Sequence, residues 1–134
     1  MRFLLVLCIL ALGIYSCDSS KSAMKGDTLT SGTSDTIRIA NDSLEYEILI
    51  IEPGFDAWLI TQPPRSYYET SYLENRNYFY VLEYNNRVRN LSFSRTLYPQ
   101  EIEYRSNIDY GHEVNYLLYN YFQYFEQKYR QRLR

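Results

Sequence analysis

Residues 114–129, which read VNYLLYNYFQYFEQKY, decide the fold of this chain. Large apolar side chains recur three and four residues apart, which is the spacing of one face of an α-helix. The face expected to be buried comprises Val114, Leu117, Leu118, Tyr121, Phe122, Phe125 and Tyr129. The side expected to be polar comprises Asn115, Gln123, Glu126, Gln127 and Arg130. We expect Asp109 to cap this helix and Glu113 to favour the positive end of its dipole.

A second long helix is predicted for residues 67–89. Ser66 and Glu69 have the S-x-x-E spacing of a capping box, and Glu83 and Arg87 can pair one turn apart. Apolar residues do not keep to one face, so such a helix must be buried on several sides. An alternative stays open for residues 78–84 (YFYVLEY), whose composition also favours a strand followed by a turn at Asn85 and Asn86.

The residues before these helices alternate with period two. Residues 35–40 and 44–52 flank the turn-forming segment Asn-Asp-Ser, which predicts a β-hairpin. The competing interpretation is a helix that begins at Ser43. The next element, residues 55–61, is expected to be a short helix that buries Phe55, Trp58 and Leu59 and ends before Pro63 and Pro64.

Residues 90–108 are expected to form a long connection, with a short strand at 102–104. The predicted architecture is therefore α+β, with an N-terminal β-hairpin packed on two long helices and one short helix.

The length of 134 residues allows one domain and excludes a TIM barrel or a complete dinucleotide-binding fold. A net charge of −2 argues against a protein that binds nucleic acid. The composition is abnormal in tyrosine, with 16 Tyr against 6 Phe and 1 Trp. None of these features names a molecular function.

The first sixteen residues are expected to be a signal peptide. A charged start precedes twelve uncharged residues, 3–14, which is too short a run for a transmembrane helix. The sequence Ile14-Tyr15-Ser16-Cys17 resembles the lipobox of bacterial lipoproteins, although Tyr15 is bulkier than usual. This resemblance implies lipid attachment at Cys17. The alternative is ordinary cleavage after Ala11-Leu12-Gly13, which would leave Cys17 free.

Residues 17–34 are rich in Ser, Thr, Gly and Asp, so we expect a flexible tether, followed by a single Tyr-rich domain over residues 35–134. Cys8 would leave with the signal peptide and Cys17 would be acylated, so no disulfide is expected. The protein would then be exported and lipid-anchored in the bacterial cell envelope, facing either the periplasm or the surface. Its first partner would be the membrane, through the lipid on Cys17.

Several blocks resemble an uncharacterised family of small Bacteroidota lipoproteins. They are Asn107-Ile108-Asp109-Tyr110-Gly111, Glu113-Val114-Asn115-Tyr116, Leu118-Tyr119-Asn120-Tyr121-Phe122, Pro53-Gly54-Phe55 with Trp58-Leu59, and the stretch from Tyr80 to Arg87. The resemblance covers residues 35–133. It implies an envelope lipoprotein of unknown function and supplies no catalytic residue.

Few residues suggest chemistry. His112 is the one histidine, and a lone histidine makes neither a metal site nor a catalytic triad, so we expect a first-turn helix residue. The acidic residues of the connection and the last helix could provide a carboxylate pair, Glu101 and Asp109, for glycan hydrolysis. The favoured interpretation of Glu101, Glu103, Asp109 and Glu113 is a solvated loop bonded to nearby arginines. We expect no metal, no cofactor and no enzymatic activity.

The charges separate along the chain. Residues 35–84 hold nine acidic and three basic residues, whereas residues 85–134 hold five acidic and eight basic ones. This favours docking of an acidic first half on a basic second half. The alternative is a basic patch for anionic lipid or polysaccharide.

Most tyrosines are expected to form the core, because a tyrosine can pack its ring and keep its hydroxyl bonded. Tyr116 and Tyr119 fall on the expected polar face of the last helix, and with Trp58 they are the candidate partner-binding residues. The predicted function is a non-enzymatic, membrane-anchored envelope protein that binds or scaffolds another envelope component. The alternative is a glycan-binding module that uses Trp58 and surface tyrosines.

Overall fold

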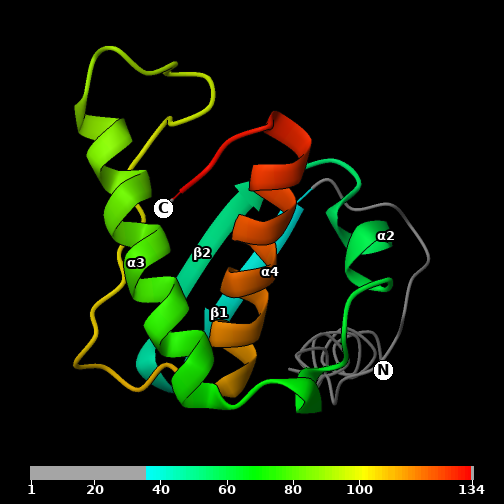
Figure 1. The fold of residues 1–134 in the computed structure, drawn as a ribbon. Helices are drawn as coiled ribbons and strands as arrows, with labels where there is room; N and C mark the ends of the chain where they lie inside the picture. The colour runs from blue at the N-terminus through cyan, green and yellow to red at the C-terminus, as the bar shows by residue number, and fades with distance from the viewer. Residues whose placement is uncertain (1–35, 134) are drawn as a thin grey trace, which may run out of the picture. The chain divides into compact units, whose positions relative to one another are not determined.

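The computed structural model describes residues 36–133. The expected signal peptide, Cys17 and tether lie outside the described residues. The element order is β1 (Thr36–Asn41), the 3-10 turn η1 (Asp42–Leu44), β2 (Tyr46–Ile51), α2 (Phe55–Leu59), the 3-10 turn η2 (Arg65–Tyr67), α3 (Thr70–Arg89) and α4 (His112–Tyr129). This confirms the α+β prediction of an N-terminal hairpin with two long helices and a short one (Figure 1).

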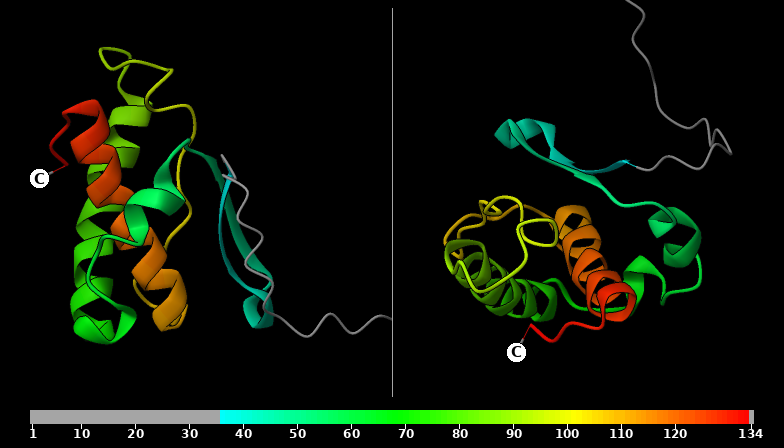
Figure 2. Two further views of the ribbon diagram at one scale, coloured as in Figure 1. Left: turned by 90° about the vertical axis from the view of Figure 1, so that its right-hand side faces the viewer. Right: turned by 90° about the horizontal axis from the view of Figure 1, so that it is seen from above.

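The hairpin forms one layer and the pair α3 and α4 forms the other (Figure 2). Helix α4 is central, because it contacts α3, β1 and α2. Helices α3 and α4 run in the same direction, so residues 90–111 return along α3 before α4 begins (Figure 1). Twenty residues of α-helix span about 30 Å, which explains the length of this connection. None of the helices within residues 36–133 has the length and apolar content needed to cross a membrane.

The hairpin is antiparallel, and its register runs from Thr36 opposite Ile51 to Asn41 opposite Tyr46. Ile37 and Ile39 of β1 are buried, and Ile48 and Ile50 of β2 pack partly against the same core. The period-two pattern is therefore real, and the alternative of a helix from Ser43 is wrong. Glu45 turns the chain between η1 and β2 in the left-handed conformation, with φ of 52°.

The starts of both long helices differ from the prediction. Helix α3 begins at Thr70, three residues later than expected, and Ser66 lies in η2 and makes no capping bond to α3. Tyr68 is extended, which separates η2 from α3. Asp109 does not cap α4, because its Oδ1 accepts a hydrogen bond from the Gly111 N–H at 2.9 Å and Gly111 is the residue before the helix.

Residues 78–84 are helical, so the strand alternative there is wrong. Tyr80, Val81 and Tyr84 of this stretch belong to the buried core, which favours the helix over the local strand propensity. The short strand expected at 102–104 is wrong as well: in the described part of the chain this segment joins no sheet. The side chain of Asn85 bonds both backbone groups of Ile102 instead.

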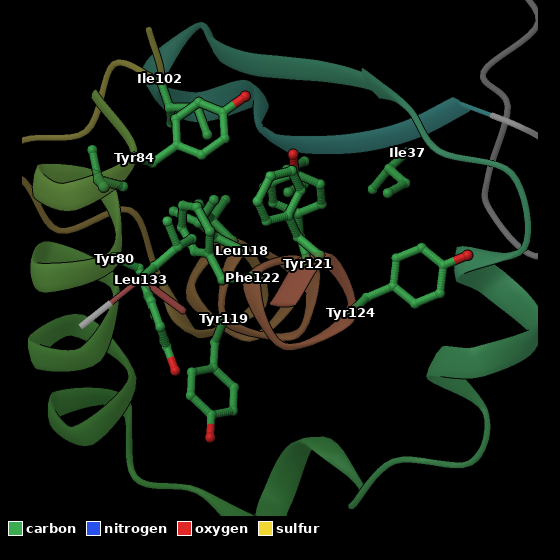
Figure 3. Close-up of a cluster of buried hydrophobic side chains, with 14 of the residues drawn as sticks. Ile37, Tyr80, Tyr84, Ile102, Leu118, Tyr119, Tyr121, Phe122, Tyr124 and Leu133 are labelled. Atoms are coloured by element: carbon green, nitrogen blue, oxygen red, sulfur yellow. The ribbon is translucent and has the colours of Figure 1, made fainter. Parts of the chain in front are cut away.

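The core is built largely of tyrosine, as predicted. The buried tyrosines are Tyr80, Tyr84, Tyr98, Tyr110, Tyr116, Tyr119, Tyr121 and Tyr124, and Figure 3 shows several of them around α4. Several of their hydroxyls are hydrogen-bonded at the edge of the core: Tyr116 donates to the Pro63 carbonyl at 2.8 Å and Tyr124 donates to the Pro53 carbonyl at 2.6 Å. Such bonds offset the cost of burying a polar group.

Candidate functional site

A groove of about 770 Å³ lies beside β2. One wall is formed by residues 45–52 and the other by residues 96–97 and 99–103 of the returning connection. Tyr84, Tyr121 and Tyr129 complete the lining among the described residues. The volume falls in the range of about 300–1,000 Å³ that is usual for ligand sites. The groove is therefore the candidate functional site.

The wall formed by β2 is the edge of a sheet. Strand β2 pairs with β1 on one side, and within residues 36–133 no other strand joins it on the second side. No backbone hydrogen bond links residues 46–51 to the returning connection in the described structure. An unpaired strand edge presents backbone donors and acceptors that can pair with another chain.

Tyrosine hydroxyls face the groove from the helical layer. Tyr84 comes from α3 and Tyr121 from α4, and the hydroxyl ends of both point toward the hairpin (Figure 3). Burial raises the pKa of the Tyr84 hydroxyl to about 12, and burial raises the pKa of the Tyr121 hydroxyl as well. Both groups therefore stay neutral near pH 7, where they can donate and accept hydrogen bonds.

Hydrogen bonds mark the two ends of the groove. At the start of β2, the Tyr46 hydroxyl donates to the Glu103 carbonyl at 2.6 Å. Beyond the end of β2, the buried carboxylate of Glu52 accepts Lys128 Nζ at 2.9 Å and the Tyr129 hydroxyl at 3.1 Å. Burial lowers the pKa of Lys128, but its bond to Glu52 outweighs this effect and the pKa is raised.

The groove is lined by acidic residues. Its lining contains Glu45, Glu47, Glu52, Glu101 and Glu103, and no lysine or arginine among the described residues. Three exposed glutamates pair with arginines that stand outside the lining, at 2.5–2.9 Å: Glu47 with Arg38, Glu101 with Arg89, and Glu103 with Arg105. Exposed pairs of this kind contribute little to stability and exchange readily.

The predicted partner-binding residues do not form a surface. Tyr116 is 2% exposed and Tyr119 is 7% exposed, so the expectation that they lie on an exposed polar face is wrong. The rings of Tyr68 and Tyr72 cover Tyr119, and the guanidinium of Arg65 lies 4.9 Å from the ring centre of Tyr116.

Trp58 is half-buried on α2. Its Nε1 donates to Gln127 Oε1 at 2.8 Å, and its ring lies 5.3 Å from that of Tyr124. Asn115, which was expected on the polar side of the helix, is fully buried and accepts the Tyr104 hydroxyl at 2.7 Å. Helix α4 is therefore covered on more sides than its sequence pattern indicates.

The four acidic residues singled out from the sequence are each held separately. Glu101 pairs with Arg89, Glu103 with Arg105, and Glu113 with Arg65, while Asp109 binds the Gly111 N–H. This agrees with the favoured interpretation of solvated carboxylates bonded to nearby arginines and backbone. Across residues 36–133, no group of three or more His, Cys, Asp or Glu side chains could hold a metal ion.

His112 joins the starts of the two long helices. Its Nε2 donates to the Arg65 carbonyl at 2.7 Å, so in the neutral ring Nδ1 accepts the Thr70 hydroxyl at 2.8 Å. The residue stands in the first turn of α4, as expected.

The expected match between an acidic first half and a basic second half is wrong as a general rule. Glu52 and Lys128 follow it, but Arg65 and Glu113 pair in the opposite sense. Glu83 and Arg87 also pair across the boundary in the expected sense, but they are neighbours one turn apart on α3. The remaining ion pairs of the described residues join groups within one half, such as Arg38 with Asp42. Local partners therefore satisfy much of the charge.

Sequence reasoning missed the groove. The alternation of residues 44–52 indicates a strand, but it does not show which segment lies beside the second edge. The acidic residues at 45, 47, 101 and 103 were a usable signal, because they alternate with apolar residues on two separate extended segments.

Comparison with known proteins identifies a family and no individual relative. No curated protein and no solved structure matches this chain. A family model matches residues 3–134, which is nearly the whole chain. The chain therefore belongs to this family, the family of unknown function DUF6146.

Proposed function

We propose that this protein is a lipid-anchored component of the bacterial cell envelope that binds another envelope component in the groove beside β2, without catalysing a reaction. The observation that carries the anchoring is the sequence Ile14-Tyr15-Ser16-Cys17 at the end of a short uncharged run. Acylation of Cys17 with several chains anchors a protein durably, whereas one chain binds membranes only marginally. The resemblance to Bacteroidota lipoproteins supports the same location.

The composition of residues 18–34 suits a tether between the membrane and the domain. A flexible chain of seventeen residues has a root-mean-square span of about 23 Å. A tether of this reach lets the groove approach a partner near the membrane while the anchor restricts the search to its surface.

A binding role rather than catalysis is supported by how the carboxylates are used. Glu101 and Asp109, the pair considered for glycan hydrolysis, are bonded to Arg89 and to the Gly111 N–H. The bond to Arg89 lowers the pKa of Glu101, so this carboxyl is a poor proton donor near pH 7.

The anchor is tested with Cys17→Ser, and Cys8→Ser is its matched control. We expect the wild type and Cys8→Ser to take up labelled palmitate and to sediment with membranes. Cys17→Ser should lose both the label and the membrane association. Label retained on Cys17→Ser would contradict the proposed anchor.

The binding role is tested by crosslinking in cells. A photoreactive residue is placed at Gln100, which is exposed in the groove wall, or at Asp56, which is exposed on α2 away from the groove. We expect a defined adduct from position 100 and none from position 56. Identical adducts from both positions, or none from position 100, would contradict binding in the groove.

A further inference from the structure

We infer that the groove takes an extended polypeptide segment with basic side chains, which adds to the free edge of β2 as a third strand. This inference rests on the proposed function, since it names the chemistry of the partner that the groove would hold. It assigns the occupant from three properties of the site: the unpaired edge, the length between the hydrogen bonds at the two ends, and the charge of the lining.

The edge supplies the backbone pairing. The outward donors and acceptors of β2 have no strand partner within residues 36–133. An extended peptide that adds to such an edge gains affinity from main-chain hydrogen bonds and specificity from alternate side chains. Every second side chain of the added strand would face the hydroxyls of Tyr84 and Tyr121, which can bond polar groups.

The hydrogen bonds at the two ends set the length of the segment. The contact between Tyr46 and Glu103 bounds one end, and the cluster of Glu52 and Tyr129 bounds the other. Strand β2 runs over six residues from Tyr46, which makes the first contact, to Ile51, which precedes Glu52; this corresponds to about 20 Å of extended chain. The groove therefore accommodates about six residues, and a compact ligand such as a mononucleotide would leave most of the edge unpaired.

The charge of the lining favours a basic segment. Five glutamates and no described lysine or arginine line the groove, and the carboxylate of Glu45 has no ion pair among the described residues. Arginine or lysine side chains of an incoming segment can pair with Glu45 and can share Glu47 and Glu101 with their exposed partners. An acidic segment would meet repulsion from Glu45, the lining carboxylate that has no ion pair among the described residues.

The same charges disfavour two other occupants. A second copy that pairs antiparallel over the whole of β2 would place Glu45 of one strand opposite Glu52 of the other, and like charges on paired strands repel. The preceding residues 18–34 carry two lysines and two aspartates, so they have no net positive charge to match the groove.

The test uses the whole lipoprotein in detergent micelles and two capped six-residue peptides, KVSVKV and EVSVEV. We expect the basic peptide to bind and the acidic peptide not to bind at the same concentration. Hydrogen exchange should show slower exchange in the complex for those amides of residues 46–51 that face away from β1. N-methylation of one alternate set of peptide amides should abolish binding, and N-methylation of the other set should not. The reason is that an added strand pairs with β2 through every second residue.

Charge-reversal variants connect this binding to the groove. Glu45→Lys with Glu101→Lys reverses two exposed lining charges, and Asp56→Lys with Glu69→Lys makes the same change of net charge at exposed positions elsewhere. We expect the groove variant to bind the basic peptide at least about tenfold more weakly, equivalent to about 1.4 kcal/mol. The control variant should stay within about twofold of wild type.

Several results would overturn the inference. These are equal binding of both peptides, binding that ignores the phase of N-methylation, slowed exchange outside residues 46–51, and competition by an oligosaccharide instead of the peptide. A dimer in light scattering that the groove variant dissociates would assign the edge to a second copy. A persistent adduct from position 100 in cells, without peptide binding, would leave the proposed function standing and reject strand addition; loss of both would reject both.

Discussion

Asn85 binds Ile102 at both of its backbone groups. Asn85 Nδ2 donates to the Ile102 carbonyl at 2.9 Å, and Asn85 Oδ1 accepts the Ile102 N–H at 2.9 Å. Both residues are buried. One amide side chain on α3 thus supplies the bonds that a neighbouring strand would supply, and it fixes the wall of the groove opposite β2.

Asn85→Ala should therefore destabilise the protein by about 2–4 kcal/mol, because it leaves a buried N–H and a buried carbonyl unpaired. Urea unfolding measures this change. Asn86→Ala, at the adjacent exposed position, should change stability by no more than about 0.5 kcal/mol. Similar losses for the two variants would show that the clamp on Ile102 contributes nothing specific.

Gly54→Ala should destabilise for two separable reasons. Gly54 has φ of 86°, and a Cβ there would lie 3.1 Å from the Tyr124 hydroxyl. We expect a loss of about 2 kcal/mol, from backbone strain and from displacement of the hydroxyl that donates to Pro53. On a Tyr124→Phe background the loss should be smaller, because no hydroxyl is displaced. An unchanged loss in this double-mutant cycle would assign the whole effect to the backbone.

Lys128→Met should destabilise by about 2 kcal/mol. It leaves the carboxylate of Glu52, whose side chain is 8% exposed, without its cation, and the partial exposure of Lys128 moderates the cost. The pair of substitutions Glu52→Gln and Lys128→Met should recover part of this loss, since no buried charge remains. Arg130→Met, at an exposed position two residues later, is the control. Urea unfolding of the wild type, Lys128→Met, the double variant and Arg130→Met measures these differences. The argument would be contradicted if the double variant were the least stable of the four.

Stability should fall steeply in alkali. Burial raises the pKa of Tyr84 to about 12 and also raises those of Tyr46, Tyr104 and Tyr121. A tyrosine is neutral when protonated, so the folded state holds protons that the unfolded chain releases near pH 10. The stabilisation is fully present below about pH 10 and is lost as the pH rises through the folded-state values.

Unfolding free energies at about pH 8 and about pH 11 measure this loss, and the near-ultraviolet absorbance of tyrosinate reports the released protons. Tyr84→Phe should lower the number of protons released on unfolding in alkali by about one, so the free energy of unfolding falls less steeply with pH. Equal stability at the two pH values would show that the buried hydroxyls already ionise in the folded protein.

The secondary structure was largely predictable because its signals are periodic. The recurrence of apolar residues in α4 and the alternation in β2 follow from the geometry of helix and strand. The starts of the helices were not predictable, because capping a helix is only one of several local hydrogen-bonding arrangements open to Ser66 and Asp109. Asp109 accepts a hydrogen bond from the Gly111 N–H instead of capping α4. Helix α3 begins only after Tyr68, whose backbone is extended.

For the candidate site, the sequence indicated the residue types, acidic and tyrosine side chains, but not their arrangement in space. Tyr116 and Tyr119 were expected at the surface because they fall outside the apolar face of the helical projection. Their burial depends on the segment that carries Arg65, Tyr68 and Tyr72, which no local pattern places over α4. The groove depends likewise on the return of residues 96–103 past β2, a relation between segments about fifty residues apart.

Trp58 gives the protein a built-in optical reporter. It is the one tryptophan of the chain, and its ring lies 5.3 Å from Tyr124 and 6.1 Å from Phe55. Light absorbed by the packed tyrosines will pass by resonance energy transfer to this indole while α2 stays docked on α4. The ratio of tryptophan to tyrosine emission therefore reads out the docking of α2 without any attached dye.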